Sequence, residues 1–138
     1  MSSATDSRPT RTSILIVEDF PLLRSGVMRW LQMRFPECLI HGVGSAEEAL
    51  AHASVSRTDI VLMDIDLPGM SGLEAVAQMK AQSPETAVVM LTMHDTPGHR
   101  LAAAGAGVAG YVLKPEMEEH LEATIERLLG NPRARISS

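Results

Sequence analysis

Five polar side chains of the sequence each come directly after a short apolar segment. They are two adjacent acids, a third acid, a hydroxyl and an ammonium group: Glu18, Asp19, Asp64, Thr92 and Lys114. Three carboxylates that lie close together repel one another unless a cation neutralises them, and Mg²⁺ takes carboxylate ligands. A carboxylate can also attack phosphorus and form an aspartyl phosphate, in which positioning and charge neutralisation carry most of the catalysis. If the fold brings them together, these side chains can accept a phosphoryl group with Mg²⁺.

The pattern of apolar residues indicates how the chain would bring these side chains together. Short apolar segments, expected to be strands, alternate with amphipathic segments, expected to be helices. The expected strands are residues 13–17, 38–43, 59–64, 86–92 and 110–114, and the expected helices are 21–34, 45–53, 72–82, 96–106 and 115–129. This alternation predicts an α/β fold, a five-stranded parallel sheet with five helices on its two faces. With strand order 2-1-3-4-5, the carboxyl ends of strands 1, 3, 4 and 5 would place the polar side chains in one cleft.

Local signals predict where several helices begin and end. Pro21 can occupy the first position of a helix, where its missing N–H is not needed. Ser45 followed by Glu48 predicts a capping box at the start of the second helix. The sequence GNP at residues 130–132 predicts the end of the last helix.

The composition excludes several classes of protein. The chain of 138 residues is long enough for one domain with a core, and its 45% hydrophobic content is too high for a disordered chain. The net charge of −5 argues against a domain that binds nucleic acid by itself. No apolar segment is long enough to span a membrane, and the N-terminus lacks the apolar region of a signal peptide. Cys38 is the one cysteine, so no internal disulfide can form, and we expect a cytoplasmic protein.

The segments around the polar side chains resemble the receiver domain of two-component response regulators, over roughly residues 12–130. The resemblance rests on Glu18-Asp19, on Asp64 with the turn LPGMSG, on Thr92, and on Tyr111 with Lys114-Pro115. The segments PLLRSG, DLPGMSGLE, LTMHD and GYVLK are most similar to the branch whose members carry a C-terminal helix-turn-helix output domain. The resemblance implies a flavodoxin-like receiver fold and a phosphorylation-controlled switch. Such a domain catalyses only its own phosphoryl transfer and dephosphorylation, so we do not expect an enzyme with a separate substrate.

The resemblance also implies the phosphoacceptor and the metal ligands. Asp64 would take the phosphoryl group from a sensor histidine kinase. Glu18 and Asp19 would form the acid pair for Mg²⁺, and Asp64 and the main-chain carbonyl of Asp66 would be further ligands. The pair is Glu-Asp here, whereas Asp-Asp is commoner in the family.

The same resemblance implies how a phosphoryl group would be sensed. Lys114 would bridge the acids and the phosphate, and its bond to Pro115 would be cis. Thr92 would move towards the phosphoryl group, and Tyr111 would then change rotamer. These movements would alter the face formed by the fourth helix, the fifth strand and the fifth helix, and with it a dimer or an output partner.

Three residues are expected to tune this chemistry. By the resemblance, the side chain of Asp66 points outward and affects the lifetime of the phosphoryl group. Met93 stands where a small residue is usual, and its bulk would restrict access to Asp64 and slow phosphorylation by small phosphodonors. The resemblance adds His94, the next residue, to these tuning positions.

Other functions compete with this interpretation. The Asp64-Ile65-Asp66 segment locally resembles the Asp-x-Asp pair of phosphohydrolases, but in those enzymes the pair follows the first strand of a larger domain. A pseudo-receiver that is never phosphorylated would work by contact alone, and the bulk of Met93 leaves room for it. A dinucleotide-binding domain is disfavoured because the first expected strand is followed by EDFP and not by a glycine-rich loop.

The expected organisation is one receiver domain with short extensions. Residues 1–12 would be a disordered lead-in, residues 13–130 the receiver domain, and residues 131–138 a tail or the start of a linker. The domain would be either a stand-alone receiver or part of a longer regulator, and the motifs favour the second. DNA would be bound only through an output domain that these residues do not contain, and a membrane is not an expected partner.

Overall fold

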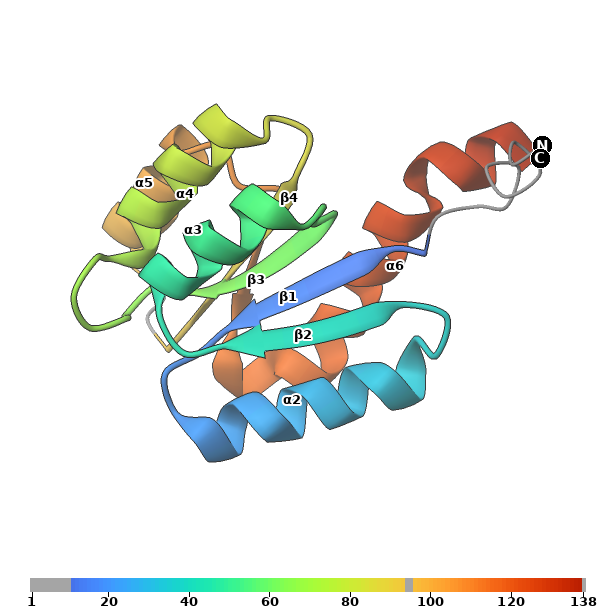
Figure 1. The fold of residues 1–138 in the computed structure, drawn as a ribbon, viewed down its shortest axis with the longest axis horizontal. Helices are drawn as coiled ribbons and strands as arrows, with labels where there is room; N and C mark the ends of the chain where they lie inside the picture. The colour runs from blue at the N-terminus through green and yellow to red at the C-terminus, as the bar shows by residue number, and fades with distance from the viewer. Residues whose placement is uncertain (1–10, 94–95, 138) are drawn as a thin grey trace.

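The strands form a single parallel sheet. The computed structural model describes residues 11–93 and 96–137, with side chains described as far as residue 130 (Figure 1). The strands are β1 (Ser13–Val17), β2 (Leu39–Val43), β3 (Ile60–Asp64), β4 (Ala87–Thr92) and β5 (Gly110–Leu113). They lie in the order β2-β1-β3-β4-β5, and every neighbouring pair is parallel. The predicted strand order is therefore confirmed.

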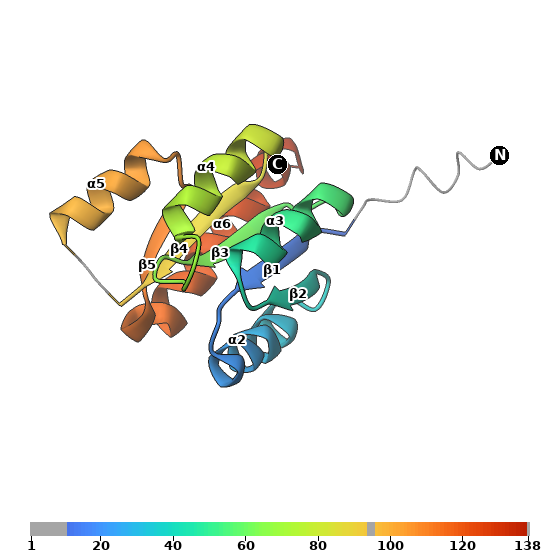
Figure 2. The same cartoon turned by 60° about the vertical axis from the view of Figure 1, so that its left-hand side comes forward.

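Helices cover both faces of this sheet. They are α2 (Pro21–Arg34), α3 (Ala46–Val55), α4 (Gly72–Gln82), α5 (Pro97–Gly105) and α6 (Met117–Ser137), and a short 3₁₀ turn, η1 (Lys114–Glu116), precedes α6. Helices α3, α4 and α5 lie on one face, and α2 and α6 lie on the other (Figure 2). Within the described part of the chain, no helix is long and apolar enough to cross a membrane.

Strands β1 and β3 are buried along their whole length. This burial on both faces of the sheet explains why their sequences are almost continuously apolar. Successive side chains of β1 point to opposite faces of the sheet. Leu15 and Val17 pack in the core under α3, α4 and α5, whereas Ile14 and Ile16 pack in the core under α2 and α6. Glu18, which follows β1, and Asp64, which ends β3, are thus positioned by strands that are packed on both faces of the sheet.

Two serines begin helices, but only one of them forms a complete capping box. At α4, Ser71 Oγ accepts a hydrogen bond from the Glu74 N–H, and Glu74 Oε1 accepts one from the Ser71 N–H, each 3.1 Å long. At α3, Ser45 Oγ accepts from the Glu48 N–H at 3.1 Å, but Glu48 Oε1 accepts from the Gly44 N–H at 2.7 Å. The capping box predicted at Ser45 is therefore wrong in its second bond, because the loop brings the N–H one residue earlier within reach of Glu48.

Most predicted element boundaries hold within one or two residues, and the largest difference lies at the C-terminal end. Helix α6 continues to Ser137 through residues 130–132, where the sequence predicts its end. A proline inside a helix removes one backbone hydrogen bond and tends to bend the helix, but this loss alone need not end it. Lys114, expected in the fifth strand, instead begins the 3₁₀ turn η1.

We expect Gly72→Ala to destabilise the domain by about 1–3 kcal/mol, the range for overpacked sites. A Cβ at Gly72 would lie 2.6 Å from the carbonyl oxygen of Asp64 and 2.9 Å from Cα of Ile65, so the backbone beside Asp64 would have to shift. Gly26→Ala is the matched control, because a Cβ in this helical position meets nothing within 4 Å. It should stabilise the domain by roughly 0.5–1 kcal/mol. Urea unfolding measures both effects, and equal changes in the two variants would contradict this account.

Candidate functional site

The side chain of Lys114 joins two acids that are far apart in the sequence. Its Nζ donates to Glu18 Oε1 at 2.9 Å and to Asp64 Oδ2 at 3.1 Å. The side chain of Lys114 is 14% exposed, and those of Glu18 and Asp64 are each 4% exposed. These charged groups are therefore bound to one another in a largely buried site at the carboxyl edge of the sheet.

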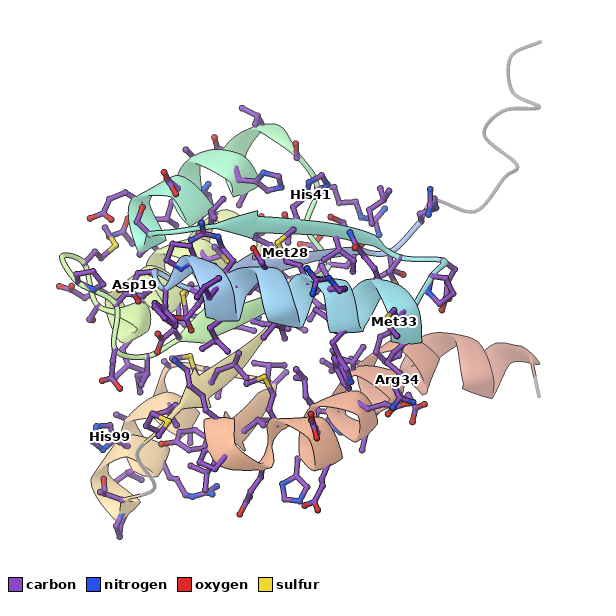
Figure 3. The ribbon with its side chains drawn as sticks, turned by 90° about the horizontal axis from the view of Figure 1, so that it is seen from below. Asp19, Met28, Met33, Arg34, His41 and His99 are labelled. Atoms are coloured by element: carbon purple, nitrogen blue, oxygen red, sulfur yellow. The ribbon has the colours of Figure 1, made fainter. Side chains whose placement is uncertain are left out.

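Asp19 completes a group of three carboxylates beside this lysine. Glu18, Asp19 and Asp64 each offer one carboxylate oxygen, and these oxygens all lie within 4.8 Å of one another. Glu18 and Asp64 are buried, whereas Asp19 is exposed; Figure 3 labels Asp19 beside the start of α2. This cluster could hold a metal ion, and oxygen ligands with one side open to water suit a hard divalent cation.

Backbone hydrogen bonds fix both buried acids in place. Glu18 Oε2 accepts from the Phe20 N–H at 3.2 Å, and the Glu18 N–H donates to the carbonyl oxygen of Val43 at 3.1 Å. Asp64 Oδ1 accepts from the Asp66 N–H at 3.0 Å. Each oxygen of the Asp64 carboxylate therefore has a bonded donor, one from the following loop and one from Lys114.

Burial and pairing act in opposite directions on the charges of this site. Burial raises the pKa of Glu18, and the nearby charge of Asp64 raises it further, while hydrogen bonds from Lys114 and Phe20 only partly oppose this. Burial alone would lower the pKa of Lys114, but its hydrogen bonds and charge interactions with the two acids outweigh burial and leave the pKa raised. Lys114 is thus an ammonium group at neutral pH.

The two residues expected to sense a phosphoryl group lie on neighbouring strands. Thr92 ends β4 and is fully buried, and it lies opposite Leu113 in the register with β5. Tyr111 is partly buried and packs against the core under α3, α4 and α5. The guanidinium carbon of Arg100 in α5 lies 4.6 Å from the centroid of the Tyr111 ring. Tyr111 therefore links β5 to α5, and both elements belong to the face that is expected to change on phosphorylation.

The structure describes two of the three residues that are expected to tune the chemistry, Asp66 and Met93. Asp66 is exposed, with its N–H bonded to Asp64 as described above. Met93 is 60% exposed in the loop after β4. His94 lies outside the described residues. Whether any of the three tunes the chemistry stays a prediction.

The bond between Lys114 and Pro115 is trans, because the described residues contain no cis peptide bond. The cis bond implied by the resemblance is therefore wrong for this structure. The trans form is intrinsically favoured at a residue before proline. With it, Lys114 already reaches both Glu18 and Asp64.

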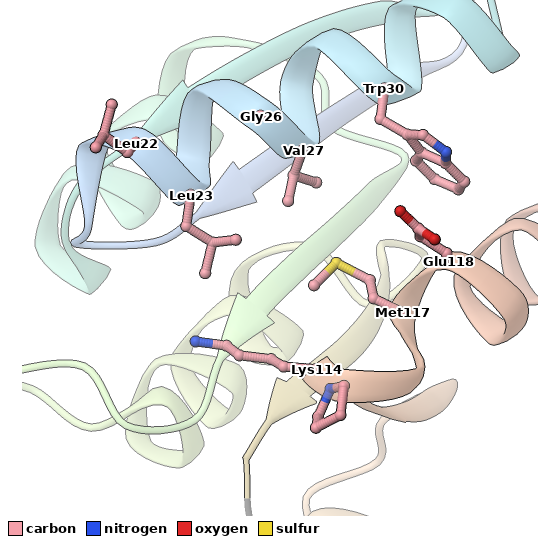
Figure 4. Close-up of a pocket in the computed structure, with 9 residues that line it drawn as sticks. Leu22, Leu23, Gly26, Val27, Trp30, Lys114, Met117 and Glu118 are labelled. Carbon is pink, nitrogen blue, oxygen red and sulfur yellow. The ribbon is translucent and has the colours of Figure 1, made fainter.

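The structure also shows two features of this region that are not predicted from the sequence. An apolar hollow of about 490 Å³ lies beside Lys114, between α2 and the start of α6 (Figure 4). Leu22, Leu23 and Trp30 line it from α2. The second feature is Arg24, whose Nη1 donates to the main-chain carbonyl of Glu18 at 2.7 Å. The segment PLLRSG contains Arg24 and the two leucines that line the hollow. Which of its side chains face the strand ends, however, depends on how α2 packs.

Comparison with known proteins establishes the family of this chain. The response regulator receiver domain family matches residues 14–126, which is most of the sequence. The chain belongs to this family. The acidic pocket formed by Glu18, Asp19 and Asp64 is typical of the phosphoacceptor site of such domains.

Similar curated proteins include two-component response regulators and transcriptional regulatory proteins. The chain is 32% identical over 124 residues to the probable transcriptional regulatory protein TcrX of Mycobacterium tuberculosis, covering 90% of this chain and 51% of TcrX. It is 33% identical over 116 residues to the two-component response regulator PhoP of Pseudomonas aeruginosa, covering 84% of this chain and 51% of PhoP. The chain thus spans about half the length of these relatives.

The fold is similar to that of solved receiver domains. The BeF₃-activated receiver domain of DrrB, a protein of Thermotoga maritima, superposes with a TM-score of 0.78 at 28% sequence identity. The similarity covers 87% of this chain and 98% of that domain. Membership of this family also argues against the phosphohydrolase and dinucleotide-binding alternatives.

Proposed function

We propose that Asp64 accepts a phosphoryl group from a sensor histidine kinase and that this modification switches the domain between two states. The observation that carries the proposal is the Lys114 ammonium bonded to both Glu18 and Asp64. Charged groups buried at one edge of a sheet are costly unless they are paired, and sites of this kind concentrate at functional positions. The pairing supports a site organised around one reacting carboxylate.

The transfer needs little from the protein beyond a nucleophile and neutralised charge. A carboxylate oxygen of Asp64 would form a bond to the phosphorus of a phosphohistidine. The bond between phosphorus and the imidazole nitrogen would break, and the imidazole would leave with the electron pair. Lys114, which is already bonded to Asp64, would then donate a hydrogen bond to one oxygen of the phosphoryl group. Thr92, at the end of β4, would donate from its hydroxyl to a second phosphoryl oxygen.

The three carboxylates fit a Mg²⁺ ion. Glu18, Asp19 and Asp64 would hold it, with the main-chain carbonyl of Asp66 as a further ligand. When bound, the ion would neutralise negative charge on the phosphoryl oxygens. The exposure of Asp19 leaves one side of this group open for water ligands, which Mg²⁺ usually keeps.

The phosphodonor is proposed to be a protein with exposed apolar surface. A phosphohistidine can reach Asp64 only if its protein contacts the rim of the site. Leu22 on α2 is 77% exposed and also lines the apolar hollow beside Lys114, and Phe20, just before this helix, is 56% exposed. Apolar side chains left exposed next to a reactive site fit a protein partner better than a small phosphodonor alone.

The output is proposed to pass through the α5-β5-α6 face. Thr92 would move towards the phosphoryl group, and Tyr111, in contact with Arg100, would change rotamer. The shifted population would favour a dimer of this chain or contact with a transcriptional output domain. DNA binding would belong to that output domain, with residues 13–130 as the receiver and the residues from 131 leading to it.

Metal removal tests this proposal directly. We expect the chain to gain one phosphoryl group in Mg²⁺ from acetyl phosphate or from phosphorylated histidine kinases, and to gain none after treatment with EDTA. Added Mg²⁺ should restore the gain, and intact mass measures it. Transfer from kinases alone would support restricted access past Met93. An equal gain without any divalent cation would contradict the metal site, and no gain from any donor would identify a pseudo-receiver.

A further inference from the structure

The side chain of Arg24 links α2 to the loop that carries two of the acids. Arg24 Nη1 donates to the main-chain carbonyl of Glu18 at 2.7 Å, a short bond of the strength expected for a charged donor. The same residue, Glu18, bonds Lys114 through its carboxylate, and Asp19 follows it in the chain. A group that fixes the backbone of Glu18 therefore also affects where both carboxylates point.

Two glycines at the end of β2 leave the space that Arg24 occupies. A Cβ at Gly42 would lie 3.2 Å from Cγ and 3.3 Å from Cδ of Arg24, and a Cβ at Gly44 would lie 3.1 Å from its Nη1. These distances are closer than most van der Waals contacts, so the extended side chain of Arg24 passes directly over both residues. Met28, one turn further along α2, also faces β2 at Gly42 (Figure 3).

Glu48 also bonds the second of these glycines, Gly44. Its Oε1 accepts from the Gly44 N–H at 2.7 Å, and it would lie 3.6 Å from a Cβ at Gly44. The Glu48 carboxylate and the Arg24 guanidinium therefore both lie beside Gly44. The end of β2 carries no acid of its own, but it leaves space for the Arg24 side chain, and its Val43 carbonyl accepts a hydrogen bond from the Glu18 N–H.

We propose that Arg24 is a positioning residue of the metal site, acting through the backbone of Glu18. By bonding the Glu18 carbonyl, it holds the Glu18-Asp19 loop so that both carboxylates converge on Asp64. Its positive charge also reduces the repulsion among the three acids. This inference rests on the proposed function, because it concerns the same Mg²⁺ site. Partners that orient metal ligands typically change metal affinity by about 10–100-fold when they are removed.

The test compares Mg²⁺ affinity in Arg24→Ala and Arg29→Ala by isothermal titration calorimetry of the full chain. Arg29 is an exposed residue of the same helix, so its removal changes the net charge equally without touching the loop. We expect Arg24→Ala to weaken Mg²⁺ binding by roughly 10-fold or more. Arg29→Ala should stay close to wild type. Arg24→Lys, which keeps the charge and one donor, should recover part of the loss.

Gly44→Ala provides an independent variant that keeps Arg24 itself. The added Cβ would push the guanidinium away from the Glu18 carbonyl, so Mg²⁺ affinity should fall in the same direction. Thermal unfolding of each variant without Mg²⁺ separates a local effect from a loss of fold, and Arg24→Lys and Gly44→Ala keep the test available if Arg24→Ala does not fold.

The outcomes distinguish this inference from the proposed function. Wild-type Mg²⁺ affinity in folded Arg24→Ala, or equal losses in Arg24→Ala and Arg29→Ala, would overturn the positioning role alone. If the wild-type chain bound no Mg²⁺ and took up no phosphoryl group, the proposed function would fail first, and this inference would fall with it.

Discussion

Asp64→Asn should abolish phosphorylation of the chain. An amide of the same shape can still accept a hydrogen bond from the Asp66 N–H, but it is not a nucleophile towards phosphorus. Removing a covalent nucleophile lowers reaction rates by factors on the order of 10⁶, so no phosphorylated species should be detectable by intact mass. The domain should stay folded, because Lys114 keeps its bond to Glu18 and one of the three carboxylates that repel one another is gone.

Asp66→Asn is the matched control for this variant. Asp66 is exposed two residues further along, and its contribution to Asp64 comes from the main chain, which the substitution leaves in place. The variant should therefore be phosphorylated, with at most a change in the lifetime of the phosphoryl group. Undiminished phosphorylation of Asp64→Asn together with loss in Asp66→Asn would show that the acceptor has been assigned to the wrong acid.

Lys114→Met should damage both the stability and the chemistry of the site. The substitution leaves Glu18 and Asp64 buried without their cation, and breaking a buried ion pair in this way costs about 3–5 kcal/mol. Phosphorylation should slow by roughly 10²–10³-fold, the usual effect of losing one charged donor to the transition state. Urea unfolding and the rate of phosphoryl uptake measure the two effects.

The loss of stability should depend on pH and on Mg²⁺. The pKa of Glu18 is already raised in the folded protein, so its carboxyl group takes up a proton more readily than it does in the unfolded chain. Folding of Lys114→Met should therefore recover as the pH falls through the folded pKa of Glu18, since protonation removes the unpaired charge. Saturating Mg²⁺ should also reduce the difference in the free energy of unfolding between Lys114→Met and the wild type, because a cation again lies among the acids.

Lys80→Met serves as the control for Lys114→Met. Lys80 Nζ also makes two short hydrogen bonds, to the carbonyl oxygens of Pro84 at 2.9 Å and Thr86 at 2.8 Å, but it contacts no acid of the site. Its removal should destabilise the domain modestly, without pH-dependent recovery and without slowing phosphoryl uptake. If both lysine variants behaved alike, the effect of Lys114 would come from lost hydrogen bonds and not from its position among the acids.

The sequence was sufficient to predict the sheet and the acids at its edge. Parallel strands buried on both faces have a simple apolar pattern, and their carboxyl ends meet at one edge whatever the details of packing. Glu18 directly follows β1 and Asp64 is the last residue of β3, so their proximity depends only on strand order. Lys114 could be included because η1 begins immediately after β5 and a lysine side chain is long enough to reach the acids.

The features that the sequence did not predict depend on how the elements pack, because packing decides which of several nearby hydrogen-bond partners a side chain takes. Glu48 bonds the N–H of Gly44 in preference to that of Ser45, a difference of one residue set by the shape of the loop. Arg24 reaches the Glu18 carbonyl only because α2 packs across the end of β2. The spacing of apolar residues shows which face of α2 is buried, but it does not show which group the charged end of a long side chain such as Arg24 will bond.

The most direct test of the central claim is to find which residue carries the phosphoryl group. The full chain would be phosphorylated in Mg²⁺ and treated at once with borohydride, which reduces an aspartyl phosphate to homoserine, and the peptides would be sequenced by tandem mass spectrometry. We expect homoserine at residue 64 and at no other aspartate, with none in a sample treated with EDTA. Modification at Asp19, at Asp66 or at a histidine, with residue 64 left as aspartate, would contradict the account.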